Sequence, residues 1–132
     1  MIVLNVQQVK SIIHDVGFLT FLDQVIARLE YDYARWDQFE KCPRHAQYST
    51  HGVIELMPIC DTSFYAMKYV NGHPVNTQHG KLSVMGLGLL ANVVDGAPLM
   101  FAEMTLLTAI RTACTSALVA HYAAREDASV LG

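Results

Sequence analysis

The stretch Ser63-Phe-Tyr-Ala-Met-Lys-Tyr-Val-Asn-Gly-His-Pro74 joins an apolar run to a single lysine, Lys68, and a turn-like ending. Short runs of apolar and aromatic residues are typical of a β-strand. Asn71-Gly72 predicts a tight turn, because both residue types tolerate positive φ angles. A cation at the mouth of a rigid turn is well placed to meet a small anionic ligand. Lys68 is therefore the first candidate functional residue.

Further strands are expected on both sides of this run, at 44–50, 52–60, 82–94 and 98–103, with the run itself at 63–70. Glycine and aspartate mark the turns at His51-Gly52, at 60–62 and at Asp95-Gly96, and the last predicts a hairpin. The strands are uniformly apolar rather than alternating. We therefore expect a sheet that is covered on both faces or closed into a barrel.

Helices are expected before and after the strands. A strand at 2–5 and a helix at 6–14, ending near Gly17, come first. The range 19–39 repeats apolar residues at spacings of three and four, which is one face of a helix, and its aromatic residues are expected in the core. Thr105 is expected to cap a helix that runs to about Ala124 and is buried, because it is rich in small residues. The aromatic residues are Tyr31, Tyr33, Trp36 and Phe39.

Composition limits the function. The 132 residues suffice for one domain, and 52% are hydrophobic while only 16% are charged. Charge this sparse indicates that apolar surface is buried against another subunit or domain. The net charge of −3, without a basic block, argues against a nucleic-acid partner. Three cysteines without a CxxC pair indicate reduced thiols in a cytoplasmic protein, and neither a signal peptide nor a membrane span is expected.

Few charged residues lie among the strands, and these are the candidates for chemistry. They are Arg44, Glu55 and Lys68, with Arg111 in the following helix. A carboxylate in mid-strand is costly unless it is paired. Three cations and one carboxylate around one cavity suit an amino acid, because the cations hold its carboxylate and Glu55 faces its ammonium group. The alternative is that Glu55 only forms a structural ion pair with Lys68 or an arginine.

Other chemistries have little support. The six histidines form no HxxxH or HxH pair, so no metal site is expected, and His73 is expected to shape the turn. There is no Gly-x-Ser-x-Gly nucleophile motif. Gly86-Leu-Gly-Leu-Leu lacks the third glycine of a dinucleotide fingerprint, and no helix is expected after it.

Five segments, spread in order along nearly the whole chain, resemble the N-terminal part of the ornithine cyclodeaminase/μ-crystallin family, and its bacterial ornithine cyclodeaminase branch most closely. The last two are specific to the family. The resemblance implies an α+β substrate-binding and dimerisation domain, with a mixed, barrel-like β-sheet and packed helices, followed by a Rossmann domain. The segments are His14-Asp-Val-Gly17, Arg35-Trp36, Gly52-Val-Ile-Glu-Leu-Met-Pro58, Lys68-Tyr-Val-Asn-Gly-His-Pro74 with Asn76-Thr77, and Glu103-Met-Thr-Leu-Leu-Thr-Ala-Ile-Arg-Thr-Ala-Cys-Thr-Ser116.

The resemblance also implies an activity. Enzymes that look like this chain are homodimeric lyases that convert L-ornithine to L-proline and ammonia, with NAD⁺ as an internally recycled hydride acceptor. By position, Arg44, Lys68 and Arg111 match the residues that hold the substrate carboxylate. Glu55 and Lys68 are the catalytic candidates, and Ser83 (usually threonine in the family) and Arg111 match cofactor contacts. Lysine cyclodeaminase, alanine dehydrogenase, ketimine reductase and a non-catalytic crystallin-like module are the alternatives.

The end of the chain carries the last expectation. Residues 1–127 are expected to form the substrate-binding and dimerisation domain, and residues 128–132 the beginning of the NAD-binding Rossmann domain. In the family, a strand like Ser129-Val-Leu-Gly132 leads into the glycine-rich dinucleotide motif, and the catalytic aspartate follows. We therefore expect a truncated chain that is inactive alone.

Overall fold

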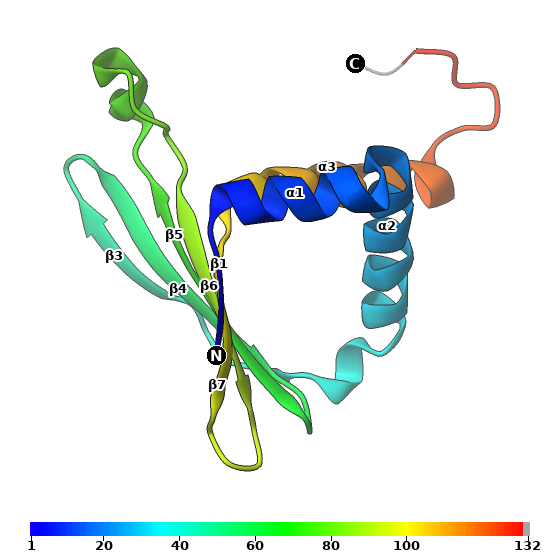
Figure 1. Ribbon diagram of the computed structural model, residues 1–132. Coiled ribbons are helices and arrows are strands. Elements are labelled where there is room, and N and C mark those ends of the chain that lie inside the picture. Colours follow the sequence, from blue (N-terminus) through cyan, green and yellow to red (C-terminus); the bar gives the residue numbers. More distant parts are fainter. Residues whose placement is uncertain (131–132) are drawn as a thin grey trace.

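The computed structural model describes residues 1–130 as a β-sheet with three α-helices on one side of it (Figure 1). Within this range no helix is long and apolar enough to cross a membrane. The elements in order are β1 (Ile2–Leu4), α1 (Val6–Val16), α2 (Phe18–Ala34), the 3₁₀ helix η1 (Trp36–Gln38), β2 (Glu40–Lys41), β3 (His45–Ser49), β4 (Gly52–Cys60), β5 (Phe64–Gly72), the 3₁₀ helix η2 (Pro74–His79), β6 (Gly86–Asn92), β7 (Pro98–Glu103) and α3 (Thr105–Ala123).

The seven strands form one mixed sheet. Its order is β1-β7-β6-β5-β4-β2, and β3 also pairs with β4. β1 is parallel to β7, whereas the other pairs are antiparallel. The α+β class with a mixed sheet and packed helices is confirmed. Within residues 1–130 the sheet is open, so the closure into a barrel that the apolar strands predicted is absent from this part of the chain.

The face of the sheet that lies toward the helices is called the inner face. The register aligns Met57, Lys68, Gly88 and Ala102 in one row across β4 to β7, and all four belong to this face. A Cβ atom on Gly88 would come within 2.8 Å of the Met104 side chain, at the start of α3. The absence of a side chain on Gly88 therefore lets the helix begin directly over the sheet.

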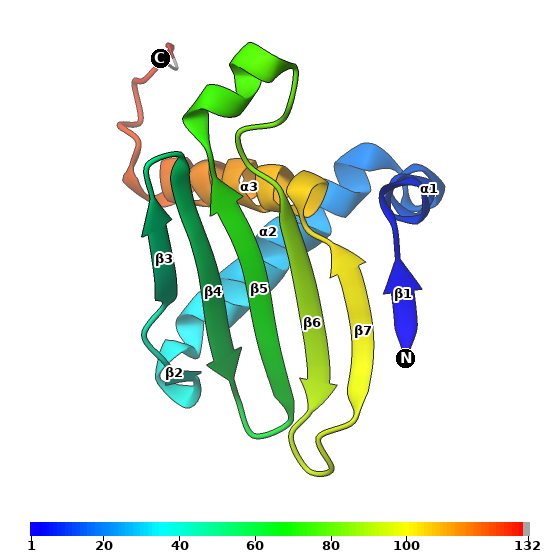
Figure 2. The same cartoon turned by 90° about the vertical axis from the view of Figure 1, so that its left-hand side faces the viewer.

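No α-helix of residues 1–130 lies over the opposite, outer face of the sheet (Figure 2). Apolar side chains are exposed on this face. Its exposed residues include Ile54, Leu87 and Phe101, with exposed fractions of 38%, 43% and 38%. The prediction of a sheet covered on both faces is therefore wrong for residues 1–130. An apolar surface of this kind is typical of an interface with another subunit or domain.

Several predictions from local signals are confirmed. β4 and β7 have the predicted limits, and a hairpin joins β6 to β7 at Asp95-Gly96. Gly96 adopts a φ of 71°, and its N–H donates to the carbonyl of Asn92 at 3.0 Å. The three cysteines are free thiols, as expected.

The predicted turn at Asn71-Gly72 is wrong. β5 runs through both residues, which pair with Ile54 and Val53 of β4. Neither residue has a positive φ, and Asn71 is buried with an exposed fraction of 7%. The chain leaves the sheet only after Gly72, in η2. Lys68 consequently lies in the middle of β5 rather than at the mouth of a turn.

The start of α3 also differs from the expectation. Thr105 begins the helix, but its hydroxyl accepts a hydrogen bond from the N–H of Gly86 at 3.1 Å. The carboxylate of Glu103 caps the helix instead, because it accepts the N–H groups of Thr105 and of Leu106, the latter at 3.2 Å. A negative charge is favourable at this end of a helix. The predicted end is confirmed at Ala123.

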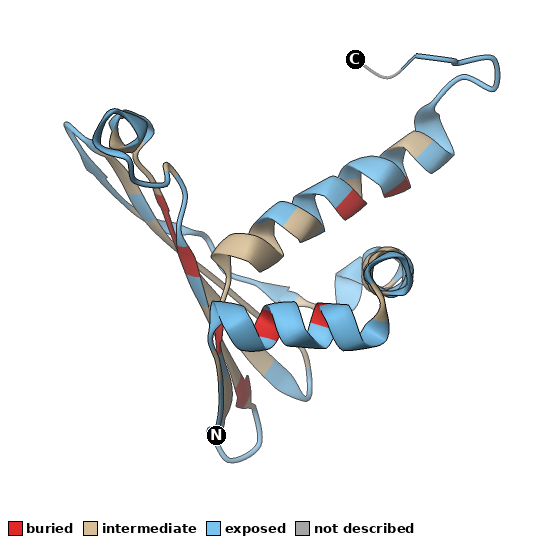
Figure 3. Cartoon of the chain, turned by 45° about the horizontal axis from the view of Figure 1, so that its top comes forward, coloured by how far each residue is buried: buried red, intermediate tan, exposed pale blue. Residues whose placement is uncertain are grey.

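The helices are less buried than predicted (Figure 3). α3 buries only Cys114 and Leu118, and α2 buries none of its residues within the described chain. Tyr31 and Trp36 are 57% and 48% exposed, so the predicted aromatic core is absent from residues 1–130. The reason is the position of α2, which stands opposite the sheet and returns to it through η1 and β2 (Figure 1).

The strand predicted from Ala128 is not formed by residues 128–130, which follow a turn after α3. Leu131 and Gly132, the remainder of that prediction, lie outside the described residues.

Candidate functional site

Three of the predicted site residues lie together at the inner face. Glu55 of β4 pairs with Val70, two residues along β5 from Lys68. Residues two apart on a strand share a face, so Glu55 is a diagonal neighbour of Lys68. Arg44 directly precedes β3, and its Nη1 lies 3.6 Å from Oε1 of Glu55. The sheet register therefore brings Arg44, Glu55 and Lys68 into one cluster.

Arg111 reaches this cluster from α3. Its positive charge is one of the causes that lower the pKa of Lys68, so the two side chains lie within electrostatic range. Its Nη2 donates a hydrogen bond to the hydroxyl of Tyr33 on α2 at 3.3 Å. Helical spacing predicted a core position for Tyr33 and did not predict this contact with Arg111.

Lys68 is half-buried at the centre of the cluster. Burial lowers its pKa, and the positive charges of Arg111 and Arg44 lower it further, while the Glu55 carboxylate opposes this shift. The cluster thus holds three cations and one carboxylate. A bound carboxylate would relieve the repulsion among the cations, and Glu55 could accept hydrogen bonds from an ammonium group. The arrangement is suited to binding a zwitterionic amino acid.

The ion pair between Arg44 and Glu55 matches the alternative prediction for Glu55, in which this carboxylate forms a structural ion pair and does not bind a ligand. Its side chains are 63% and 23% exposed at a separation of 3.6 Å. Pairs of this length and exposure contribute little to stability. Among residues 1–130, Lys68 takes part in no ion pair. Structural pairing therefore accounts for Glu55 in part, and leaves the charge of Lys68 available to a ligand.

A pocket of about 210 Å³ adjoins Lys68 on the inner face. Its walls are apolar and include Met57 and Gly88, the two cross-strand neighbours of Lys68, and Met104. Such walls suit the aliphatic part of a small ligand.

Ser83 lies apart from the charged cluster. It precedes β6 by three residues, whereas Gly88, the cross-strand partner of Lys68, lies inside that strand. The carbonyl of Ser83 accepts the N–H of His73 at 2.8 Å. Its expected contact with a cofactor rests on the family resemblance and stays a prediction.

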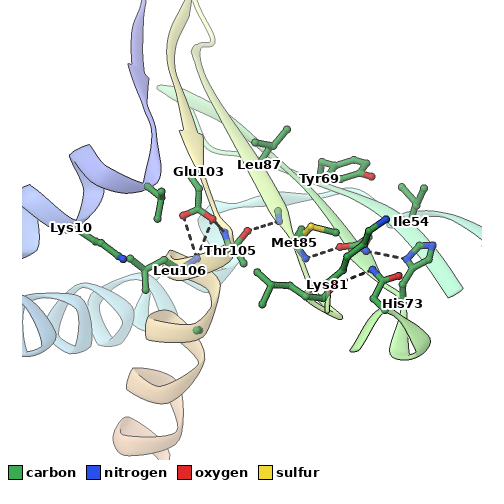
Figure 4. Close-up of a pocket in the computed structure, with 16 residues that line it drawn as sticks. Lys10, Ile54, Tyr69, His73, Lys81, Met85, Leu87, Glu103, Thr105 and Leu106 are labelled. Carbon is green, nitrogen blue, oxygen red and sulfur yellow. Dashed lines mark hydrogen bonds between the residues drawn. The ribbon is translucent and has the colours of Figure 1, made fainter. Parts of the chain in front are cut away.

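A larger cavity, of about 990 Å³, lies elsewhere, at the end of the outer face (Figure 4). Lys10, Tyr69, His73, Leu87 and Glu103 are among its lining residues, and the charged cluster does not contribute to it. Most of its wall is apolar and continues the uncovered outer face. The cluster brings three cations and one carboxylate together, an arrangement that can neutralise both ends of an amino acid. No three His, Cys, Asp or Glu side chains within residues 1–130 gather into a metal site.

Comparison with known proteins relates this geometry to a family. Residues 6–132 match the ornithine cyclodeaminase/mu-crystallin family. The ornithine cyclodeaminase of Agrobacterium tumefaciens (strain Ach5) is 47% identical over 128 residues, which are 97% of this chain and 36% of that protein. The chain thus spans about a third of the length of the curated relatives that it matches.

Two solved structures share the fold. An archaeal alanine dehydrogenase dimer with bound NAD superposes with a TM-score of 0.84 and 27% identity, over 100% of this chain and 40% of that one. The Δ1-pyrroline-2-carboxylate reductase of Thermococcus litoralis, in complex with NADH and L-proline, superposes with a TM-score of 0.80 and 28% identity. The match covers 96% of this chain and 39% of the reductase chain.

Proposed function

Because the chain belongs to the ornithine cyclodeaminase/mu-crystallin family, we propose that it is the N-terminal part of an ornithine cyclodeaminase. This lyase converts L-ornithine to L-proline and ammonia. The observation that carries the proposal is the excess of positive charge around Lys68 at the inner face, with one carboxylate beside it. The activity is proposed for a protein of the relatives' length, since the chain spans 36% of the Agrobacterium tumefaciens enzyme.

The proposed roles follow from charge. Lys68, Arg44 and Arg111 hold the substrate carboxylate, and this fixes the direction of the α-carbon hydrogen. Orientation of this kind supplies a large part of catalysis. Glu55 accepts hydrogen bonds from a substrate amine and can hold a proton there, so Glu55 and Lys68 are the catalytic candidates of this chain. NAD, when bound, supplies the acceptance and return of hydride.

Ser83 and Arg111 are the proposed contacts to NAD. A hydroxyl and a guanidinium are donors suited to the ribose and phosphate oxygens of a nucleotide. One turn before Arg111, the hydroxyl oxygen of Thr108 is buried without a hydrogen-bond partner among the described residues, and a ligand could satisfy it. We assign residues 1–127 to the substrate-binding and dimerisation domain. Residues 128–132 begin the domain that holds most of the cofactor.

The outer face is the proposed homodimer interface. Its apolar residues lie uncovered, and the archaeal relative is a dimer. Two such faces packed together form a barrel-like structure between subunits, which the open sheet of one chain lacks. The three free thiols support a reducing compartment, and the cytoplasm is the proposed location.

The proposal is tested by assaying the full-length gene product with ornithine, lysine, alanine and pyruvate. Proline formation from ornithine without net accumulation of NADH is the expected result. Net NADH from alanine would instead identify an alanine dehydrogenase, the activity of the archaeal structural relative. Preference for lysine would identify a lysine cyclodeaminase, and ornithine binding without turnover a crystallin-like module.

Lys68→Ala connects this activity to the inner face. It is expected to raise the ornithine KM by about 100-fold or to abolish turnover, with an unchanged circular dichroism spectrum, because a buried charged contact to the carboxylate is lost. Lys10→Ala is the matched control, since Lys10 lines the large cavity and lies outside the cluster. Normal kinetics of Lys68→Ala would remove Lys68 from the site.

A further inference from the structure

A buried polar residue, Asn71, lies where β5 ends. Its Oδ1 accepts the N–H of Met85 at 2.6 Å, and its Nδ2 lies 3.0 Å from Nδ1 of His73. A backbone N–H can only donate, so the amide oxygen must face Met85 and the amide nitrogen must face His73. Nδ1 of His73 is therefore the acceptor, and its proton is on Nε2. Met85 and His73 together hold the Asn71 amide in this orientation.

Asn76, in η2, holds the same segment from the other side. Its Nδ2 donates to the carbonyl of Leu82 at 3.0 Å, and its own carbonyl accepts the N–H of Lys81 at 3.0 Å. Asn76 thus binds the residue before Ser83, while Asn71 binds Met85, two residues after it. Two asparagine side chains therefore hold the backbone on either side of Ser83.

The imidazole of His73 packs against the hairpin between β3 and β4. A Cβ atom on Gly52 would come 2.1 Å from the carbonyl oxygen of Gly72 and 2.9 Å from Cγ of His73. Only glycine permits this approach. The hairpin backbone thus lies on one side of the ring, and the Asn71 amide holds its Nδ1.

We propose that Asn71 and Asn76 are positioning residues that hold Ser83 for a nucleotide, and that the imidazole of His73 supports them through its contact with the Asn71 amide, beside the direct bond from the His73 N–H to the Ser83 carbonyl. The inference rests on the proposed function, because it takes Ser83 as a contact to NAD. A hydroxyl that is held before binding avoids the entropy cost of ordering a loop. Of the three residues proposed to hold the substrate carboxylate, only Lys68 lies on β5, and it is on the opposite face of that strand from Asn71. Loss of the asparagine bonds should therefore weaken nucleotide binding and spare ornithine binding.

The first test measures the NAD dissociation constant of the full-length gene product by calorimetry. Asn71→Leu and Asn76→Leu are each expected to raise it about 5- to 10-fold, because each removes a side-chain hydrogen bond that holds the backbone beside Ser83. The ornithine KM should change less than about twofold in the same variants. Gln78→Leu is the matched control, because Gln78 is an exposed amide in the same short helix. It should leave both constants unchanged.

The second test asks whether the effect passes through Ser83. Ser83→Ala is expected to raise the NAD dissociation constant, and adding Asn76→Leu or His73→Phe to it should raise the constant no further. Asn71→Asp keeps the acceptor for Met85, so it should bind NAD more tightly than Asn71→Leu. If the leucine variant fails to fold, Asn71→Asp is compared with wild type, and its NAD dissociation constant should rise less than that of Asn76→Leu.

Three results would overturn the inference. One is an unchanged NAD dissociation constant in both asparagine variants while Ser83→Ala has its effect. Another is full additivity between Ser83→Ala and Asn76→Leu. The third is a wild-type protein that binds no NAD. That result would overturn the proposed function itself, so NAD binding by wild type is measured before any variant is compared.

Discussion

The inner and outer faces of the sheet are built from the same strands and carry opposite chemistry. On β5, Lys68 lies half-buried among other cations on the inner face, while the next residue, Tyr69, points to the apolar outer face. Side chains alternate between faces along a strand, so a shift of one residue in register would exchange them. This contrast between a charged inner face and an apolar outer face is the basis of the two proposals, a ligand site on one side of the sheet and a subunit interface on the other.

The largest expected effect comes from placing a charge on the outer face. Phe101→Glu on β7 should convert a dimer to a monomer at micromolar concentrations, weakening association about 100-fold or more, because an unpaired carboxylate is costly to bury. Sedimentation velocity measures the change in the full-length gene product. Val94→Glu is the control, since Val94 is 87% exposed in the hairpin between β6 and β7. A Phe101→Glu protein that remains dimeric would remove the outer face as the interface.

A smaller effect is expected from pH, and it distinguishes the charge of Lys68 from the shape of its side chain. Because burial and the neighbouring arginines lower its pKa, Lys68 loses its proton at a lower pH than an exposed lysine. Ornithine affinity should therefore fall as the pH rises through that lowered pKa. Arginine keeps its charge, so Lys68→Arg should move the fall to higher pH.

The measurement is the ratio of wild-type to Lys68→Arg ornithine KM from neutral to alkaline pH, in which titration of the substrate cancels. Above the pKa of Lys68 the ratio should grow by up to about tenfold per pH unit. A ratio that does not change with pH would show that the charge of Lys68 does not hold the carboxylate.

The smallest effect is expected at the turn between β4 and β5, where Asp61 connects the sheet to the end of α2. The Asp61 carboxylate accepts the N–H groups of Ser63 and Phe64, each at 2.8 Å, and pairs with Arg35 at 3.2 Å. The bonds to Phe64 and Ser63, followed by Arg35, lower the pKa of Asp61. The stabilisation is therefore present at neutral pH and is lost as the pH falls through that lowered pKa.

Asp61→Asn keeps an acceptor for the turn and loses the charge. It should lower the Tm of the full-length gene product by about 3 °C at neutral pH, and the difference should close in acid. Scanning calorimetry against Asp23→Asn, an exposed site on α2, supplies the control. A difference that persists in acid would assign the loss to the changed turn geometry and not to the charge.

Local signals account for most of the strands, and tertiary contacts account for the failures. Gly52 and Pro98 open β4 and β7 as predicted. Asn71-Gly72 carries a strong turn signal. The Asn71 side chain, however, forms hydrogen bonds with Met85, fourteen residues away along the chain, and with His73. A single sequence contains no pattern for this bond. Aromatic spacing in α2 identified one face of the helix, but it did not reveal that no core within residues 1–130 covers that face.

The candidate site was partly visible in the sequence, because charges are rare among apolar strands. Glu55, Lys68 and Arg44 stood out for that reason, although only the register brings them to one face. Arg111 lies near them through the packing of α3, which spacing does not predict. Tyr33 was missed because its partner, Arg111, is 78 residues away in the sequence.

Recognition of a carboxylate by the inner face can be tested by comparing two diamines in the full-length gene product with NAD present. L-Ornithine and 1,4-diaminobutane differ only in that carboxylate. Wild-type protein should bind ornithine about 100-fold or more tightly than the diamine, because unpaired cations are costly. Lys68→Ala should lose most of this preference, and Lys10→Ala should keep it. Equal binding of the two compounds by wild-type protein would show that the inner face does not recognise the carboxylate. An undiminished preference in Lys68→Ala would show that Lys68 does not bind it.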